Sequence, residues 1–270
     1  MSDDSTASGT RPVIFDVGLH HGEDTDFYLR KGFDVVAVEA DPRHVAKAKE
    51  RFAGLIAEGR LEIVAAAVVD RSFTEPEIEF YVNLDKDDWG STDAAYGARG
   101  GTRHEVIRVP TVRMDELYTR VVRYGLSTPA MPGPRRVHYV KIDIEGGDHA
   151  ALLGMVGVER SMLPKYISCE AIKLEYAALM SAIGYTKFKV VNQNLNWTRK
   201  LPNPPREGAG GEGWFEYQFK GHSSGPFGEE APGEWLDFET AAEIYLAHKR
   251  MVRMSPTVSN AWFDFHGARL

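Results

Sequence analysis

The stretch from Val13 to Asp41 constrains the fold of this chain more than any other. It begins with the apolar run Val13-Ile14-Phe15, continues through a turn that contains Gly18 and Gly22, and reaches a second apolar run at residues 35–38. The segment between the two runs has the length and composition of a helix. This order of strand, glycine turn, helix and strand predicts the first half of a nucleotide-binding α/β sheet.

The residues around the turn indicate which ligand it suits. We expect the two glycines to let the turn approach a ligand that a Cβ would exclude. Glu39 ends the second run, where a carboxylate can accept hydrogen bonds from ribose hydroxyls. The first helical turn carries Glu23, Asp24 and Asp26, and these acids would repel a pyrophosphate at the helix N-terminus. S-adenosylmethionine has no phosphate and carries a cationic sulfonium, so the turn favours it as cofactor. An NAD-dependent oxidoreductase and a cofactor-binding module without catalysis are the alternatives.

Composition excludes several classes of protein. With 270 residues, of which 43% are hydrophobic, the chain is long and apolar enough to bury one sizeable core. The net charge of -7 argues against nucleic acid as a partner. The single cysteine, Cys169, excludes an intrachain disulfide and fits a reducing compartment. The longest apolar run, residues 63–69, is too short to span a bilayer, and residues 1–11 lack the apolar segment of a secretion signal. We therefore expect a cytoplasmic protein without a membrane partner.

Apolar runs and amphipathic segments alternate along the chain and predict a mostly parallel sheet with helices on both faces. We expect a disordered start over residues 1–11, one α/β domain over residues 12–230, and a C-terminal helix and tail over residues 231–270 that pack on the domain. The expected further strands cover residues 61–69, 78–82, 106–112, 137–144, 166–169, 188–191 and 214–219. The expected further helices begin near residues 42, 114, 148, 174 and 238.

Polar residues stand at the ends of most expected strands. Ligands of such sheets bind outside the carboxyl ends of the strands, so we expect these side chains to gather at one edge. They are Asp16, Glu39, Asp70, Asp143, Glu145, Glu170 and Asn192.

Four motifs in this order resemble the FkbM-type family of S-adenosylmethionine-dependent methyltransferases. They are D-V-G-L-H-H-G at residues 16–22, V-E-A-D-P at 38–42, R-M-D-E-L at 113–117 and K-I-D-I-E-G at 141–146. The segment S-S-G-P-F-G-E-E at 223–230 extends the resemblance over residues 12–230. The resemblance implies a seven-stranded, Rossmann-like class I methyltransferase sheet with an antiparallel last strand. It also implies methyl transfer, commonly to a hydroxyl of a sugar, polyketide or other small metabolite. At the turn, Leu19-His20 replaces the family's Ala-Asn, which leaves the contacts to the methionine portion open.

Methyl transfer to a hydroxyl requires alignment of the two reactants and a base or metal that takes the proton. We expect the base to be Glu145, His149 or Glu170, in that order, while Asp143 could serve either catalysis or the cofactor. The expected cofactor-binding residues are Asp16, Gly18, His20, Gly22, Thr25, Glu39, Ala40, Asp41, Ala67 and Asp143. The expected acceptor-binding residues are Asn192, Asn194, Trp197, His222, Ser223 and Ser224. No His/Cys group has zinc spacing, so no metal is predicted. A homodimer stays open.

Overall fold

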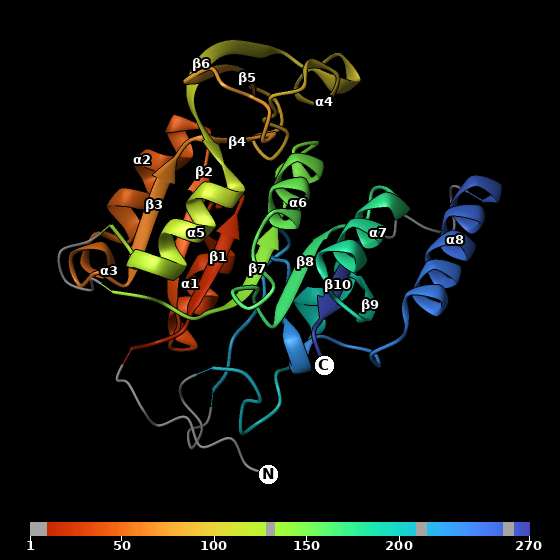
Figure 1. Cartoon of the computed structure of the whole chain (residues 1–270). Helices are drawn as coiled ribbons and strands as arrows, with labels where there is room; N and C mark the ends of the chain where they lie inside the picture. The colour runs from red at the N-terminus through yellow and green to blue at the C-terminus, as the bar shows by residue number, and fades with distance from the viewer. Residues whose placement is uncertain (1–9, 128–132, 209–214, 256–261) are drawn as a thin grey trace.

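The computed structural model describes residues 10–127, 133–208, 215–255 and 262–270. Residues 1–9 of the expected disordered start lie outside that part. The main sheet has seven strands in the order β3-β2-β1-β7-β8-β10-β9, and β10 runs antiparallel to β8 and β9 (Figure 1). This confirms the predicted sheet. Its strands are β1 (Val13–Val17), β2 (Asp34–Glu39), β3 (Leu61–Ala65), β7 (Val137–Ile142), β8 (Tyr166–Glu170), β9 (Lys187–Asn192) and β10 (Phe263–Ala268).

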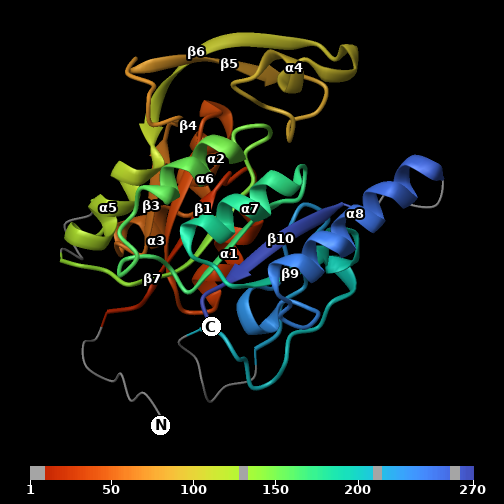
Figure 2. The same cartoon turned by 45° about the vertical axis from the view of Figure 1, so that its right-hand side comes forward.

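A small second sheet of order β4-β6-β5 lies beyond the carboxyl ends of the parallel strands (Figures 1 and 2). The chain enters it directly from β3, because it turns away from the main sheet at Ala66, whose N–H donates to the carbonyls of Glu39 and Val64. The expected single strand over residues 61–69 is therefore wrong, and two strands in different sheets replace it. The strands of the small sheet are β4 (Ala67–Val69), β5 (Glu77–Asn83) and β6 (His104–Arg113).

Helices cover both faces of the main sheet. Asp41 caps one of them by accepting a hydrogen bond from the Arg43 N–H, with Pro42 as the first helical residue, as the sequence predicts. The helices are α1 (Glu23–Arg30), α2 (Pro42–Arg51), α3 (Ala53–Ala57), α4 (Ala94–Gly97), α5 (Met114–Tyr124), α6 (Asp148–Val156), α7 (Leu174–Ile183) and α8 (Phe238–Met254). In the described part of the chain, no helix is both long and apolar enough to cross a bilayer.

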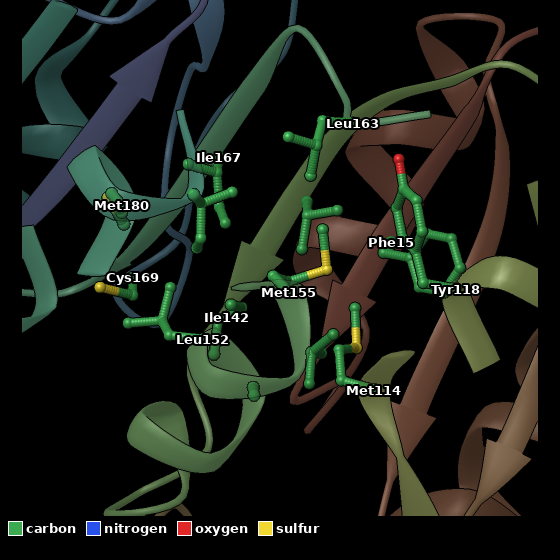
Figure 3. Packing of buried hydrophobic residues seen from close by; sticks show 14 of the residues in the cluster. Phe15, Met114, Tyr118, Ile142, Leu152, Met155, Leu163, Ile167, Cys169 and Met180 are labelled. Atoms are coloured by element: carbon green, nitrogen blue, oxygen red, sulfur yellow. The ribbon is translucent and has the colours of Figure 1, made fainter. Parts of the chain in front are cut away.

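Strand β1 divides the core into two layers because its side chains alternate between the faces of the sheet. Phe15 belongs to the cluster under α5, α6 and α7, where its ring lies 5.3 Å from that of Tyr118 and near Met114 (Figure 3). Ile14 belongs to the opposite cluster, together with residues of α1 and α2. All five residues of β1 are buried, which fixes the strand at the centre of the sheet.

Coil, rather than helix, covers part of the second face. Phe219 and Phe227 are fully buried in the cluster around α1, and Phe227 stacks on Tyr139 of β7 at 4.6 Å. The expected strand over residues 214–219 is wrong for residues 215–219, which are described and form no strand, and Trp214 lies outside the described residues. The seventh strand is β10, so residues 263–268 of the expected C-terminal tail complete the main sheet.

Candidate cofactor and active site

A pocket of about 1010 Å³, counted with its open mouth, lies at the carboxyl ends of β1, β2 and β7. Strand register places it there, because Val17 pairs with both Val38 and Ile142 and the residues that follow these strands meet at one edge. Residues 87–92, which follow β5, form another wall. The predicted site residues that line the pocket are Gly18, His20, Glu39, Ala40, Asp41, Ala67, Asp143, Glu145 and His222.

Glu39 is held by backbone donors on both carboxylate oxygens. The N–H of His20 donates at 2.8 Å to Oε2, and the N–H of Asp41 donates at 2.7 Å to Oε1. The turn can present the His20 N–H because His20 adopts a left-handed backbone with φ 50°. Burial raises the pKa of Glu39, although the two N–H bonds act against this rise. Each oxygen keeps a further lone pair, so a fixed carboxylate stands ready to accept hydrogen bonds at the end of β2.

Lys141 of β7 ties the glycine turn to the sheet. Its buried Nζ donates to the Gly18 carbonyl at 2.8 Å and lies 3.2 Å from Asp16 Oδ1 and 3.7 Å from both Asp24 Oδ2 and Asp143 Oδ2. Burial alone would lower the pKa of Lys141, but the surrounding carboxylates raise it well above its usual value. Burial raises the pKa of Asp16 to about 6, against the pull of Lys141.

Asp16 and Thr25, both predicted to contact the cofactor, contact each other instead of lining the pocket. Asp16 lies within β1 rather than at its end and is fully buried. It accepts a hydrogen bond from Thr25 Oγ1 at 2.6 Å, which fixes the start of α1 against the strand. Their positions indicate that they stabilise the glycine turn without lining the pocket.

The two glycines of the turn are required by the packing of the chain itself. A Cβ on Gly18 would lie 1.9 Å from the carbonyl oxygen of Asp143, and one on Gly22 would lie 2.7 Å from the Phe52 ring. Both glycines also have positive φ. The close approach of a ligand to these glycines stays a prediction, and Gly18 lines the pocket.

Glu145 stands in the pocket wall in an unusual backbone conformation. Its φ is 31°, a region that non-glycine residues rarely adopt. Ser91 Oγ donates to its carbonyl at 2.6 Å, and Arg99 donates to Oε2 at 2.7 Å. Burial raises the pKa of Glu145, while Arg99 lowers it. The sequence did not single out Ser91 and Arg99, because they come from a glycine-rich segment that reads as an ordinary loop.

Three further acids have raised pKa values and lie at the end of β8, the start of α6 and the start of β10. Burial, followed by the charges of Asp143 and Glu145, raises the pKa of Glu170 to about 8. Burial and Asp143 raise the pKa of Asp148 to about 7. Asp264 of β10 pairs in register with Glu170, and burial raises its pKa well above the usual range. Glu170 itself does not line the pocket.

Most residues predicted to bind the acceptor lie outside the pocket. Asn192 caps the 3-10 helix Gln193–Thr198, which also holds Asn194 and the exposed Trp197, and none of the three lines the pocket. His149, a predicted base, lies 3.2 Å from Glu175 on the surface. Asp70, predicted at the shared edge, instead accepts hydrogen bonds from Ser72 in an exposed turn, because β4 has left the main sheet.

Ser223 and Ser224 are buried beside the pocket, where their polar groups bind a carboxylate. Ser223 Oγ donates to Asp24 Oδ1 at 2.6 Å, and the Ser224 N–H donates to both Asp24 oxygens at 3.0 Å. The pocket is also lined by Asp24, Lys141 and His44, which are not among the site residues predicted from the sequence. The K-I-D-I-E-G motif contains Lys141 and was the signal that could have found it.

The sheet order and the antiparallel β10 are those of the class I methyltransferase fold. The model of the methyltransferase FkbM domain matches residues 16–195, and the chain belongs to this family. The resemblance predicted from the motifs is thereby confirmed, and the oxidoreductase alternative is wrong. No curated protein sequence gives a significant match.

Similar folds occur among solved structures. One is the methyltransferase FkbM from Methylobacillus flagellatus KT, with 13% identity, a TM-score of 0.40 and coverage of 67% of this chain and 40% of that chain. The chain thus spans less than half of that protein. Another is a SAM-dependent methyltransferase from Thiobacillus denitrificans in complex with S-adenosyl-L-homocysteine, with 11% identity, a TM-score of 0.35 and coverage of 96% and 86%. A third is precorrin-6y C5,15-methyltransferase from Geobacter metallireducens GS-15, with 10% identity, a TM-score of 0.38 and coverage of 98% and 82%.

The residues of the pocket fit S-adenosylmethionine. Glu39 offers oriented lone pairs for a ribose diol. The wall around the glycine turn is rich in carboxylates, including Glu23, Asp24 and Asp143, and suits a ligand that carries a sulfonium and an ammonium group. Apolar side chains of Val68 and Phe80 line the opposite part, where a flat base can pack.

Proposed function

We propose that this protein transfers the methyl group of S-adenosylmethionine to a hydroxyl of a small molecule. The observation that carries the proposal is Glu145, a carboxylate in the pocket wall whose backbone is strained and whose side chain is held by Arg99. Strained backbone of this kind clusters at active sites, where neighbouring structure must hold it in place. A carboxylate with a raised pKa that still pairs with a guanidinium is suited to accept a proton near neutral pH.

The chemistry follows from what a hydroxyl requires. S-adenosylmethionine supplies an electrophilic methyl group bound to a positively charged sulfur. An acceptor hydroxyl is a weak nucleophile until its proton leaves, and Glu145 takes that proton as the oxygen forms its bond to the methyl carbon. The electron pair of the broken carbon–sulfur bond stays on sulfur. Arg99 positions Glu145 and keeps it ionised before the transfer.

The charge of the pocket supports a small neutral or cationic acceptor. The lining of the pocket includes the carboxylates of Asp87, Asp88, Asp143 and Glu145. A polyphosphate backbone would meet repulsion from these carboxylates, and the net charge of -7 acts in the same direction. Sugars, polyketides and related alcohols present hydroxyls without that penalty.

An acceptor screen followed by one substitution tests the proposal. Purified protein is incubated with S-adenosylmethionine labelled in the methyl group and with panels of sugars, polyketide alcohols, phenols and amines. With the best acceptor, Glu145→Gln should lower turnover by ~10²-fold or more, whereas the surface variant Glu50→Gln should match wild type. Binding of S-adenosylhomocysteine, measured by calorimetry, should stay near wild type in both variants. Full turnover in Glu145→Gln, or methylation of amines alone, would contradict the proposal.

A further inference from the structure

Three histidines from separate parts of the chain meet at the edge of the pocket. His20 and His21 lie in the turn before α1, and His44 lies on α2. The ring centroids are 3.8 Å apart for His20 and His21, 4.8 Å for His20 and His44, and 5.1 Å for His21 and His44. One ring nitrogen from each residue lies within 4.8 Å of the other two.

A carboxylate completes the group. Asp87, from the wall segment after β5, places Oδ2 3.0 Å from His21 Nε2 and Oδ1 3.8 Å from His20 Nε2. The His44 Nε2 lies 3.2 Å from the Asp87 carbonyl, so all three rings surround this residue. The three imidazoles thus lie close together, and the Asp87 carboxylate lies beside two of them, His20 and His21.

The nitrogen atoms of this group are poorly satisfied by the protein. Among the described residues, buried His20 Nε2 and His44 Nδ1 have no hydrogen-bond partner. An orphaned buried nitrogen costs free energy unless something binds it. A metal ion bound to these nitrogens would remove that cost.

We propose that His20, His21 and His44, with Asp87 as fourth ligand, bind one divalent transition-metal ion of the Zn²⁺ class. Imidazole and carboxylate donors in fourfold geometry suit Zn²⁺, whereas Mg²⁺ and Ca²⁺ select oxygen ligands. Tetrahedral Zn–N bonds of about 2.0–2.1 Å separate the nitrogens by about 3.4 Å. The ring nitrogens are at most 4.8 Å apart, so side-chain rotations that move them by about 1 Å bring them to that spacing.

The ion would crosslink three segments that lie apart in the sequence. These are the glycine turn after β1, the first half of α2 and the wall segment that contains Asp87. Because the metal binds the folded chain and not a preformed site in the unfolded chain, loading should raise the melting temperature. Glu145 lines the same pocket as His20, His44 and Asp87 but is not among the four proposed ligands, so metal binding can be measured without reference to the proposed methyl transfer.

Metal titration of the full chain tests the inference. Tag-free protein is treated with a chelator, exchanged into chelator-free buffer, and titrated with Co²⁺ and Zn²⁺ by calorimetry and visible absorption. We expect one ion per chain, the strong visible absorption of four-coordinate Co²⁺, its displacement by Zn²⁺, and a higher melting temperature with metal. The same titration of Glu145→Gln should give the same result, which separates this site from the proposed base.

Matched variants locate the ligands. His21→Gln and His44→Gln should each weaken Zn²⁺ binding by at least about 100-fold, more than changes outside the ligand shell usually cause. The exposed His104→Gln on β6 serves as the control and should bind as wild type. His21 is partly exposed, so His21→Gln should fold normally, and its circular dichroism and metal-free melting curve check this. No binding by wild type, a six-coordinate Co²⁺ spectrum, or equal affinity in His21→Gln and His104→Gln would overturn the proposal.

Discussion

Replacing Lys141 by Met should lower the melting temperature of the protein more than the replacement of any exposed residue. The substitution keeps most of the apolar stem of the side chain but removes the cation that faces Asp16, Asp24 and Asp143. At an effective dielectric constant of about 20, unit charges at the 3.2 Å that separates Lys141 Nζ from Asp16 Oδ1 attract by about 5 kcal/mol. The side chains of Lys141 and Asp16 are 4% and 0% exposed, so solvent screens this pair little.

The measured loss should be smaller than this attraction, because the desolvation of the lysine is relieved at the same time. Breaking a buried pair by removing one partner usually costs about 3–5 kcal/mol. For a chain of 270 residues, this corresponds to a melting temperature lower by about 5–9 °C. The control is Lys47→Met, an exposed position on α2, which should melt as wild type.

The dependence on pH separates an electrostatic loss from a packing loss. Burial already raises the pKa of Asp16 to about 6, and without Lys141 this pKa should rise further. A carboxyl group with a raised pKa holds its proton in the folded state, so stability falls as pH rises from the unfolded pKa through the folded one. The deficit of Lys141→Met should therefore be larger at about pH 8 than at about pH 5. Equal deficits at both pH values, or an unchanged melting temperature, would refute the reasoning.

Two further substitutions test the cofactor side. Glu39→Ala should weaken binding of S-adenosylhomocysteine by about 1–3 kcal/mol in calorimetry, because a ribose diol would lose its acceptor. Unchanged affinity would remove Glu39 from the site. Gly18→Ala should lower the melting temperature of the cofactor-free protein, because its Cβ would lie 1.9 Å from the Asp143 carbonyl oxygen. A variant that melts normally but fails to bind the cofactor would instead restore the ligand as the reason for this glycine.

Most of the sheet could be predicted from the sequence, because the local patterns and the tertiary structure agree along most of its strands. Short apolar runs lie within β1, β2, β7 and β8, which are five or six residues long, and Asp41 and Pro42 begin α2 as its N-cap and first residue. The failures occurred where long-range packing decides. Residues 61–69 look like one strand because residues 63–69 are all apolar, and only the hydrogen bonds of Ala66 divide the segment. Residues 215–219 alternate like a strand, but their aromatic rings pack as coil against α1.

The site was predictable at the carboxyl ends of β2 and β7 because polar residues directly follow strands whose order the fold dictates. Glu39, Asp143 and Glu145 all line the pocket for that reason. The histidine group was not predictable from spacing, because His44 lies on α2 whereas His20 and His21 lie in the turn before α1, and only the fold brings them together. Arg99 and Ser91 likewise reach Glu145 across a distance in sequence that no motif records.

Residues 223–230 do not line the pocket but bind residues that do, and we therefore do not expect them to select the acceptor directly. Ser223 and Ser224 direct their donors at Asp24, and Glu230 forms a buried ion pair of 2.6 Å with Lys31 of the chain after α1. These contacts hold the first helix and its acids in place, so changes in this segment should alter cofactor binding and stability together. Residues 87–92 reach the pocket from the side of the small sheet, and within them Asp87 contacts His20 and His21 of the glycine turn. For the proposed transfer to a hydroxyl, we therefore expect acceptor choice to depend on residues 88–92, which lie in the pocket wall together with Glu145.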